Sequence, residues 1–214
     1  MSEKEKFVLA TTSDRRSITV KMVSDFLKTK DTKALADFIY KRLYGRYLKS
    51  FDYENDDYIK NYKNGFAIMA SCCLLIETYI SFTVKEFRYT RNKSMGTFGV
   101  FFTTQDKFKV FSKGGRKNDK LSTQREGGTP NDFYQNVRCG ILHNAETRNG
   151  WRISRNPKKP MFNESTKEIN AVKFANNLKA VLKDYKNNLE KSDFDKDSIW
   201  INFRNRINDL IESV

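Results

Sequence analysis

The sequence predicts an all-α fold, a helical bundle of about five to seven helices with a small irregular or β-hairpin insertion. Two observations favour it. Apolar residues recur at spacings of three and four in several long segments. Residues 64–84 carry one charge, that of Glu77, as expected of a helix buried at the centre of a bundle. No internal repeat or long low-complexity tract points to another architecture.

The N-terminal region predicts an arm followed by two helices. Residues 1–16 are polar and charged apart from a short FVLA patch, which predicts a flexible, loosely held arm. A single helical domain is expected over 17–214. Its first helices are predicted in SITVKMVSDFLKTK and DTKALADFIYKRLYGRYLKSF, with Asp31 as the N-cap of the second.

The middle of the chain predicts a core helix, a second helix and a loop. Residues 64–84 are assigned to the core helix. The phenylalanines of MGTFGVFFTTQDKFKVFSK follow a helical stripe, although TFGVFF alone also fits a strand, and we expect a helix. Residues 113–130 are charged and rich in glycine, which predicts a mobile connection.

A further helix is predicted between residues 130 and 149. Thr129 and Pro130 have the chemistry of an N-cap and a first helical position, and Asn149-Gly150 is expected to end the helix. The following WRISRNPKKPMFNESTKEIN predicts a loop or small β-hairpin. The segments AVKFANNLKAVLKDYKNNLEK and FDKDSIWINFRNRINDLIESV then return to helical spacing.

Charge and cysteine usage limit the partners and the compartment. Lys and Arg number 40 against 26 Asp and Glu, so the formal net charge is +14, which favours RNA, DNA or an anionic membrane surface. Three cysteines, two of them adjacent in the apolar segment, fit reduced thiols and a cytoplasmic setting. The N-terminus lacks the apolar core of a signal peptide, and we expect a soluble protein with no membrane span.

Arg138 lies among apolar residues. At about 100° per residue, Tyr134, Val137 and Ile141 fall on the same helical face as the arginine. A guanidinium on an apolar face needs an acceptor, because an unpaired buried charge is costly. Glu77 is the acid of the core helix and needs a cation for the same reason. We therefore expect an ion pair between Glu77 and Arg138.

His143 is the only histidine in the chain. On one straight helix it lies about 140° from Arg138, so the two side chains are not expected to share a face. Either Gly140 loosens the turn, or a symmetric dimer brings two copies into one groove. Cleavage of RNA by its own 2′-hydroxyl needs a base, an acid and a cation. A two-fold dimer would supply two histidines and two arginines.

These residues resemble a known family. RCGILH, residues 138–143, is similar to the R-x(4-6)-H motif of HEPN (higher eukaryotes and prokaryotes nucleotide-binding) domains. VRCGILHNAET, the preceding FYQN and the upstream CCLLIETYISF and FFTTQDKFKVF also resemble bacterial members, and the likeness extends more loosely from about residue 60 to the C-terminus.

The resemblance implies a helical homodimer with a composite endoribonuclease site that needs no metal and no cofactor. It makes Arg138 and His143 the catalytic pair, with Glu77 orienting the arginine. Family members often carry a polar residue directly after the arginine; here Cys139 stands there, and Asn144 is the candidate for that supporting role. Toxin–antitoxin, abortive-infection or other antiviral defence, with an antitoxin or regulatory protein as partner, is also implied.

Two other function classes stay open. A non-catalytic module could bind RNA or a nucleotide with Arg138 and nearby cations, and Tyr134 or Trp151 could stack on bases unless the core buries them. A helical interaction protein would dimerise without specific RNA affinity. The candidate RNA-binding cations are Arg116, Lys117, Arg152 and Arg155.

Two catalytic chemistries are disfavoured. One histidine and no tight acidic cluster give no recognisable metal-ligand set. Cys72 and Cys73 lie in apolar surroundings that suppress thiolate formation, and Cys139 has no base within its own turn.

Overall fold

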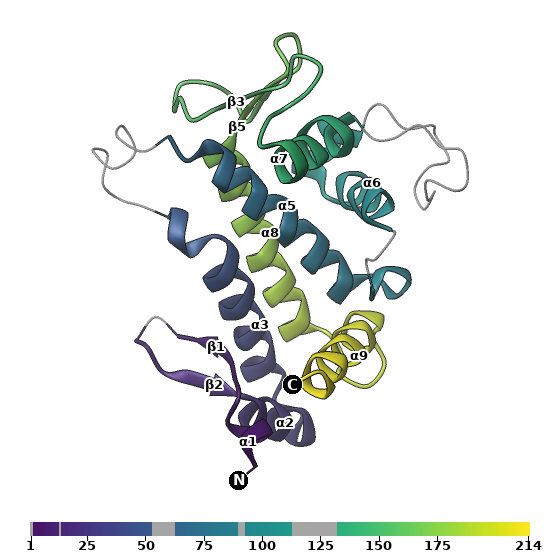
Figure 1. Cartoon of the computed structure of the whole chain (residues 1–214). Helices are drawn as coiled ribbons and strands as arrows, with labels where there is room; N and C mark the ends of the chain where they lie inside the picture. Colours follow the sequence, from purple (N-terminus) through teal and green to yellow (C-terminus); the bar gives the residue numbers. More distant parts are fainter. Residues whose placement is uncertain (1, 13, 53–62, 90–92, 113–131) are drawn as a thin grey trace.

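A computed structural model describes residues 2–12, 14–52, 63–89, 93–112 and 132–214, and helices make up most of them (Figure 1). The predicted all-α class is therefore confirmed in its broad sense. The buried apolar side chains form one contiguous cluster that extends from the N-terminal hairpin to the last helix. The glycine-rich segment 113–130, including the predicted cap Thr129-Pro130, lies outside the described residues.

The N-terminal segment is packed, which corrects the prediction of a loosely held arm. After the short helix α1 (Glu3–Lys6), strands β1 (Val8–Thr11) and β2 (Ser17–Thr19) pair antiparallel. The FVLA patch supplies the reason, because Leu9 and Ala10 are buried against the core at 1% and 6% exposure. The first long helix, α2 (Val20–Thr29), consequently begins three residues later than Ser17 and is capped by Thr19.

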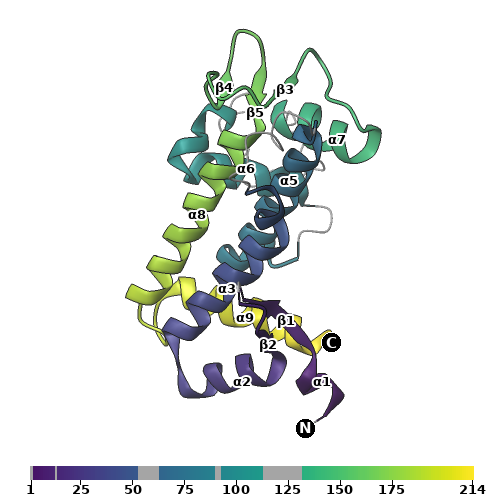
Figure 2. The same cartoon turned by 90° about the vertical axis from the view of Figure 1, so that its left-hand side faces the viewer.

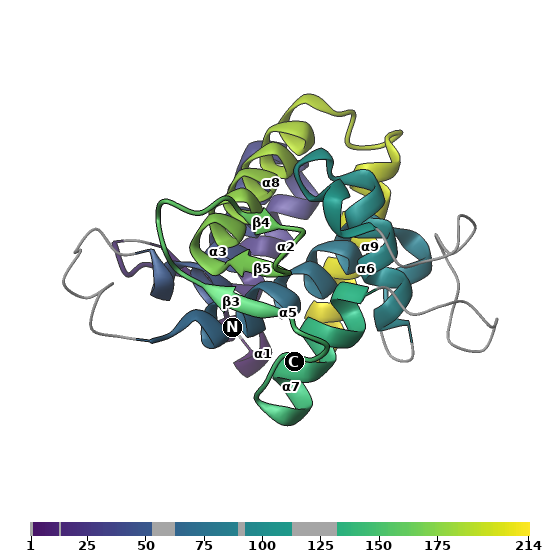
Figure 3. The same cartoon turned by 90° about the horizontal axis from the view of Figure 1, so that it is seen from above.

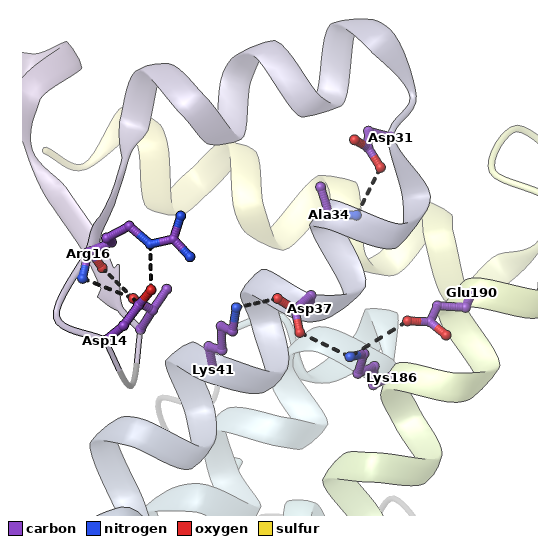
Figure 4. Close-up of polar contacts among 9 residues, drawn as sticks. Asp14, Arg16, Asp31, Ala34, Asp37, Lys41, Lys186 and Glu190 are labelled. Carbon is purple, nitrogen blue, oxygen red and sulfur yellow. Dashed lines mark hydrogen bonds and ion pairs between the residues drawn. The ribbon is translucent and has the colours of Figure 1, made fainter.

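Helix α3 (Thr32–Tyr47) begins where the sequence predicts. The Asp31 carboxylate accepts a hydrogen bond from the Ala34 backbone N–H at 2.9 Å, the contact of an N-cap (Figure 4). Further along, Asp37 pairs with Lys41 of its own helix and with Lys186 (Figure 4). The short 3-10 helix η1 (Lys49–Phe51) follows α3.

The predicted core helix is α5 (Gly65–Thr83), which packs against α3, α8 (Ala171–Lys191) and α9 (Ser198–Glu212) (Figures 1 and 2). By length and composition α5 could cross a membrane, but most of it is buried inside the protein, as in the core helix of a soluble protein. The 3-10 turn η2 (Lys85–Phe87) follows it.

The phenylalanine-rich segment is helical, as predicted: α6 (Ser94–Thr104) continues into the 3-10 helix η3 (Asp106–Ser112). Its rings surround Phe133, which is fully buried. The Phe133 ring stacks on Phe174 with centroids 5.6 Å apart and meets Phe102 edge-on at 4.9 Å. These contacts fix the start of the helical segment that carries Arg138.

That segment consists of a π-helical turn, η5 (Tyr134–Arg138), followed by α7 (Cys139–Asn144). α7 ends at Asn144, five residues before the predicted stop at Asn149, because Ala145 turns into the left-handed conformation. A three-stranded sheet stands where a loop or hairpin was expected. Strands β4 (Phe162–Asn163) and β5 (Glu168–Asn170) are antiparallel, and β3 (Arg152–Ser154) adds parallel to β5.

Candidate active site

The candidate site lies where η5 and α7 pack against α5 (Figure 3). The Cys139 backbone N–H donates to the Tyr134 carbonyl five residues earlier, which is the hydrogen bond of a π turn. Single π turns inside α-helices are often found at functional sites, because the extra residue changes which side chains share a face. Arg138 is the last residue of this turn.

The ion pair expected from the sequence is present. Arg138 Nε donates to Glu77 Oε1 at 2.9 Å, and Arg138 Nη2 lies 2.9 Å from the same oxygen. Both side chains are 14% exposed, so water screens the pair only weakly. The guanidinium carbon also lies 5.6 Å from the centroid of the Tyr134 ring. The carboxylate and the ring hold Arg138 against α5.

The surroundings stabilise the charged form of Arg138. Burial alone would lower the pKa of Arg138, but the Glu77 carboxylate outweighs that effect and leaves the pKa raised. Burial, assisted by the Cys139 thiol, raises the pKa of Tyr134 to about 12. The arginine is therefore a permanent cation, and Tyr134 is a neutral phenol at physiological pH.

His143 reaches Arg138 within one chain, which corrects the expectation that a loosened turn or a second copy is needed to bring them together. Arg138 Nη1 lies 3.4 Å from His143 Nε2. The long arginine side chain reaches the position that the 140° rotation had appeared to exclude. The imidazole itself is exposed. Because a guanidinium has only donors, Nε2 is the acceptor in this contact.

Gly140 permits a close backbone approach behind the motif. A Cβ on Gly140 would lie 2.5 Å from the Glu146 carbonyl oxygen and 3.4 Å from Thr147 Cα. The chain folds back here through Ala145, whose φ is 56°. Gly140 therefore does not loosen the helix, as the sequence had suggested; it allows the turn after α7 to lie directly against it.

The buried Asn136 holds the same turn, a role that the sequence had not revealed. Its carbonyl accepts from the Arg148 backbone N–H at 2.9 Å, and its side-chain oxygen accepts from Asn149 Nδ2 at 2.7 Å. It belongs to the quoted FYQN, but helical spacing alone gives no sign that its partners lie twelve and thirteen residues away. Asn136 positions the turn that follows His143.

Replacing Gly140 with alanine is expected to lower the free energy of unfolding by about 1–3 kcal/mol, because the added methyl group would press on a backbone carbonyl. Gly45→Ala on α3 is the matched control. A Cβ at Gly45 meets nothing within 4 Å, so this variant should be neutral or stabilised by up to about 1 kcal/mol. Equal unfolding midpoints for the two variants in urea would contradict the close approach.

Asn144 is not brought into the Arg138–His143 contact. Its side-chain oxygen instead accepts a hydrogen bond from Arg148 Nη2. Both residues are exposed and adjoin His143 on the same short segment. Arg148 is therefore an exposed cation next to the site that was not predicted from the sequence.

The other predicted RNA contacts fall in different places. Arg152 is exposed on β3, whereas Arg155 is partly buried, with its Cγ and Cδ close to Gly65 at the start of α5. Arg116 and Lys117 lie outside the described residues. Trp151 is 8% exposed and stacks on Phe162 at 5.3 Å, so it is used in the core and not for base stacking.

The cysteines form no disulfide, and two of them are poor nucleophiles. Cys72 and Cys73 are buried free thiols, and burial raises the pKa of both. Cys139 is a half-buried free thiol beside Tyr134. Within the described ranges no group of three or more His, Cys, Asp or Glu side chains is placed to hold a metal ion.

No protein-family model, curated protein or solved structure matches the chain. The function must therefore be inferred from the side chains. Of the predicted site residues, the structure brings Glu77, Arg138 and His143 into one continuous line of contacts that leads from α5 to the surface.

Proposed function

We propose that this chain is a metal-independent endoribonuclease of the HEPN type. The observation that carries the proposal is the Glu77–Arg138–His143 line: a largely buried carboxylate holds an arginine, and the arginine touches the only histidine, which is exposed. A fixed guanidinium beside an accessible imidazole suits phosphoryl transfer, because the first stabilises negative charge and the second moves protons near neutral pH. We also propose that the helices of this chain form a bundle like that of HEPN domains.

The chemistry follows from the groups present. The 2′-oxygen of a ribose attacks the adjacent phosphorus, the bond from phosphorus to the 5′-oxygen breaks, and a 2′,3′-cyclic phosphate and a 5′-hydroxyl form. His143 Nε2 takes the 2′-hydroxyl proton once Arg138 Nη1, which otherwise occupies its lone pair, donates to the phosphate instead. Arg138 donates to the phosphate oxygens as charge builds up in the transition state. Glu77 acts through Arg138 as a positioning residue.

The acid that protonates the 5′-oxygen is proposed to be His143 of a second copy. One chain offers one histidine, and a symmetric dimer offers a base and an acid together. The surface of α5 supports this arrangement, because Leu74, one turn before Glu77, is 44% exposed and Phe66 is 39% exposed. A monomeric mass at micromolar concentration in sedimentation equilibrium would overturn the dimer.

The setting of the enzyme is proposed from the resemblance. We place it in the cytoplasm, which the free cysteines suit, and in a toxin or antiviral-defence role. RNA is the proposed substrate, and an antitoxin or regulatory protein is the proposed partner. The net charge of +14 favours an RNA ligand through counterion release.

RNA cleavage in the presence of EDTA tests the proposed reaction. The rate is expected to stay within about twofold of the rate without chelator, because arginine and histidine supply the charge and proton transfers that a metal would otherwise provide. Activity that disappears in EDTA and returns with a divalent cation would overturn the mechanism. RNA that is retained on the protein at low salt, released at high salt and never cut would favour a binding module instead.

A further inference from the structure

The hairpin of β1 and β2 lies at the opposite end of the molecule from α7 (Figures 1 and 2), and a second basic site adjoins it. It is a cleft of about 490 Å³ between strand β1 and helix α3. Residues 8–12 form one wall, and five cations line the cleft: Arg15, Lys41, Arg42, Arg46 and Lys49. Among the described residues that line it, none carries a carboxylate.

Arg42 is the deepest of these cations. It is 7% exposed, and its Nη1 donates to the Leu9 carbonyl of β1. Arg46 Nη2 lies 3.4 Å from the same carbonyl oxygen, so two guanidinium groups converge on one neutral acceptor. Burial and the nearby Arg46 lower the pKa of Arg42 to about 10. A buried guanidinium beside a second cation is stabilised by an anion.

Only one of the cations on the helical wall of the cleft forms an ion pair with a described carboxylate. Lys41 pairs with Asp37 at 2.5 Å, as Figure 4 shows. Among the ion pairs of the described residues, none includes Arg42, Arg46 or Lys49. Arg42 and Arg46 lie four residues apart on one face of α3, and Lys49 follows at the start of η1.

Gly45 has no side chain to fill the space between Arg42 and Arg46. It lines the cleft between the cations, and a Cβ there would meet no atom within 4 Å. The opposite wall is formed by Val8, Leu9 and Ala10, and none of the described residues that line the cleft is aromatic. Nucleotide bases are usually held by stacking on aromatic side chains, so this surface suits phosphates better than bases.

We propose that this cleft binds the sugar–phosphate backbone of single-stranded RNA, as an anchoring site separate from Arg138 and His143. The choice of RNA rests on the proposed nuclease function, whereas the selection of phosphates rests on the cations of the cleft. Arg42 and Arg46 hold one phosphate at the Leu9 end, and Lys49, just beyond the end of α3, binds a further phosphate of the same RNA. The site binds without regard to base sequence.

Binding of a fluorescent single-stranded DNA oligonucleotide tests the site. DNA carries the same phosphodiester backbone but has no 2′-hydroxyl, so the proposed reaction cannot cleave it. The double variant Arg46→Ala/Lys49→Ala removes two exposed cations and leaves the buried Arg42 in place. We expect affinity to fall roughly tenfold or more near 0.1 M salt, and the slope of log K against log salt to fall by about 1.4.

The matched control removes two exposed charges from α8, with Lys183→Ala/Lys191→Ala. It should change affinity by less than about twofold if the cleft is the specific site. Equal losses for both double variants, or no loss for either, would overturn the proposal. Inorganic tripolyphosphate that binds one to one while the oligonucleotide does not bind would also overturn it, and would indicate a small-ligand site.

The result of the DNA-binding test can be distinguished from the result of the RNA-cleavage test. Wild-type and His143→Ala protein are expected to bind the DNA equally, since His143 is not part of the cleft. Suppose that neither protein cleaves RNA, but that Arg46→Ala/Lys49→Ala lowers the affinity for DNA as expected. The nuclease proposal then fails, and the phosphate-binding proposal is supported.

Discussion

Replacing His143 with alanine is expected to slow RNA cleavage about 100- to 10,000-fold, the usual contribution of general acid–base catalysis. In the proposed dimer each site loses both its base and its acid, which favours the upper part of that range. The measurement is the single-turnover cleavage rate of a labelled RNA in EDTA.

The fold should tolerate this change. His143 is exposed, and its one described side-chain contact is the 3.4 Å approach to Arg138. The free energy of unfolding is therefore expected to stay within about 0.5 kcal/mol of the wild-type value. A folded His143→Ala protein that cleaves RNA at the wild-type rate would contradict the assignment of His143.

Replacing Glu77 with glutamine is expected to affect both stability and activity. The amide keeps the shape of the side chain but cannot balance the Arg138 charge. Removing one partner of a fully buried ion pair costs about 3–5 kcal/mol, and because these side chains are 14% exposed we expect about 1–3 kcal/mol. Cleavage should slow about tenfold or more, since a misplaced guanidinium no longer meets the phosphate.

Asp209→Asn is the matched control for Glu77→Gln. Asp209 pairs with Arg88 between α9 and η2, and its side chain is 10% exposed, similar to Glu77. This control should lower stability but leave the cleavage rate unchanged, which separates loss of an ion pair from loss of the site. An unchanged unfolding midpoint in urea and an unchanged rate for Glu77→Gln would show that the pair does not hold Arg138.

Isolated charges on apolar faces made the central pair predictable. Glu77 stands alone in an uncharged stretch, and Arg138 lies at the centre of an apolar stripe, so each had to find a partner. The core helix and the Asp31 cap followed from equally local rules. These features depend on residue type and spacing, which the sequence contains directly.

The features that the sequence did not reveal depend on distant backbone contacts. The π turn at Tyr134–Arg138 is a choice of hydrogen-bond register, and helical spacing does not encode it. The approach of Arg138 to His143 was missed because it depends on the conformation of the long arginine side chain, which helical rotation does not give. Gly140 faces a carbonyl that only the folded turn brings near.

The N-terminal hairpin was missed for a similar reason. In the sequence, a short FVLA patch between charged residues is typical of a flexible arm. In the structure this patch pairs with β2, and Leu9 is buried in the core. Arg42 was then hidden within a helix that appears amphipathic and solvated, because its burial depends on β1. The basic cleft exists only when both segments are assembled.

The most direct test of the central claim is the mass of the fragment ends that wild-type and His143→Ala protein make from a mixed RNA in EDTA. The proposed mechanism predicts 2′,3′-cyclic phosphates and 5′-hydroxyls from the wild-type protein and neither from the variant. Fragments with 3′-hydroxyl and 5′-phosphate ends, or cyclic-phosphate fragments made equally by both proteins, would contradict it.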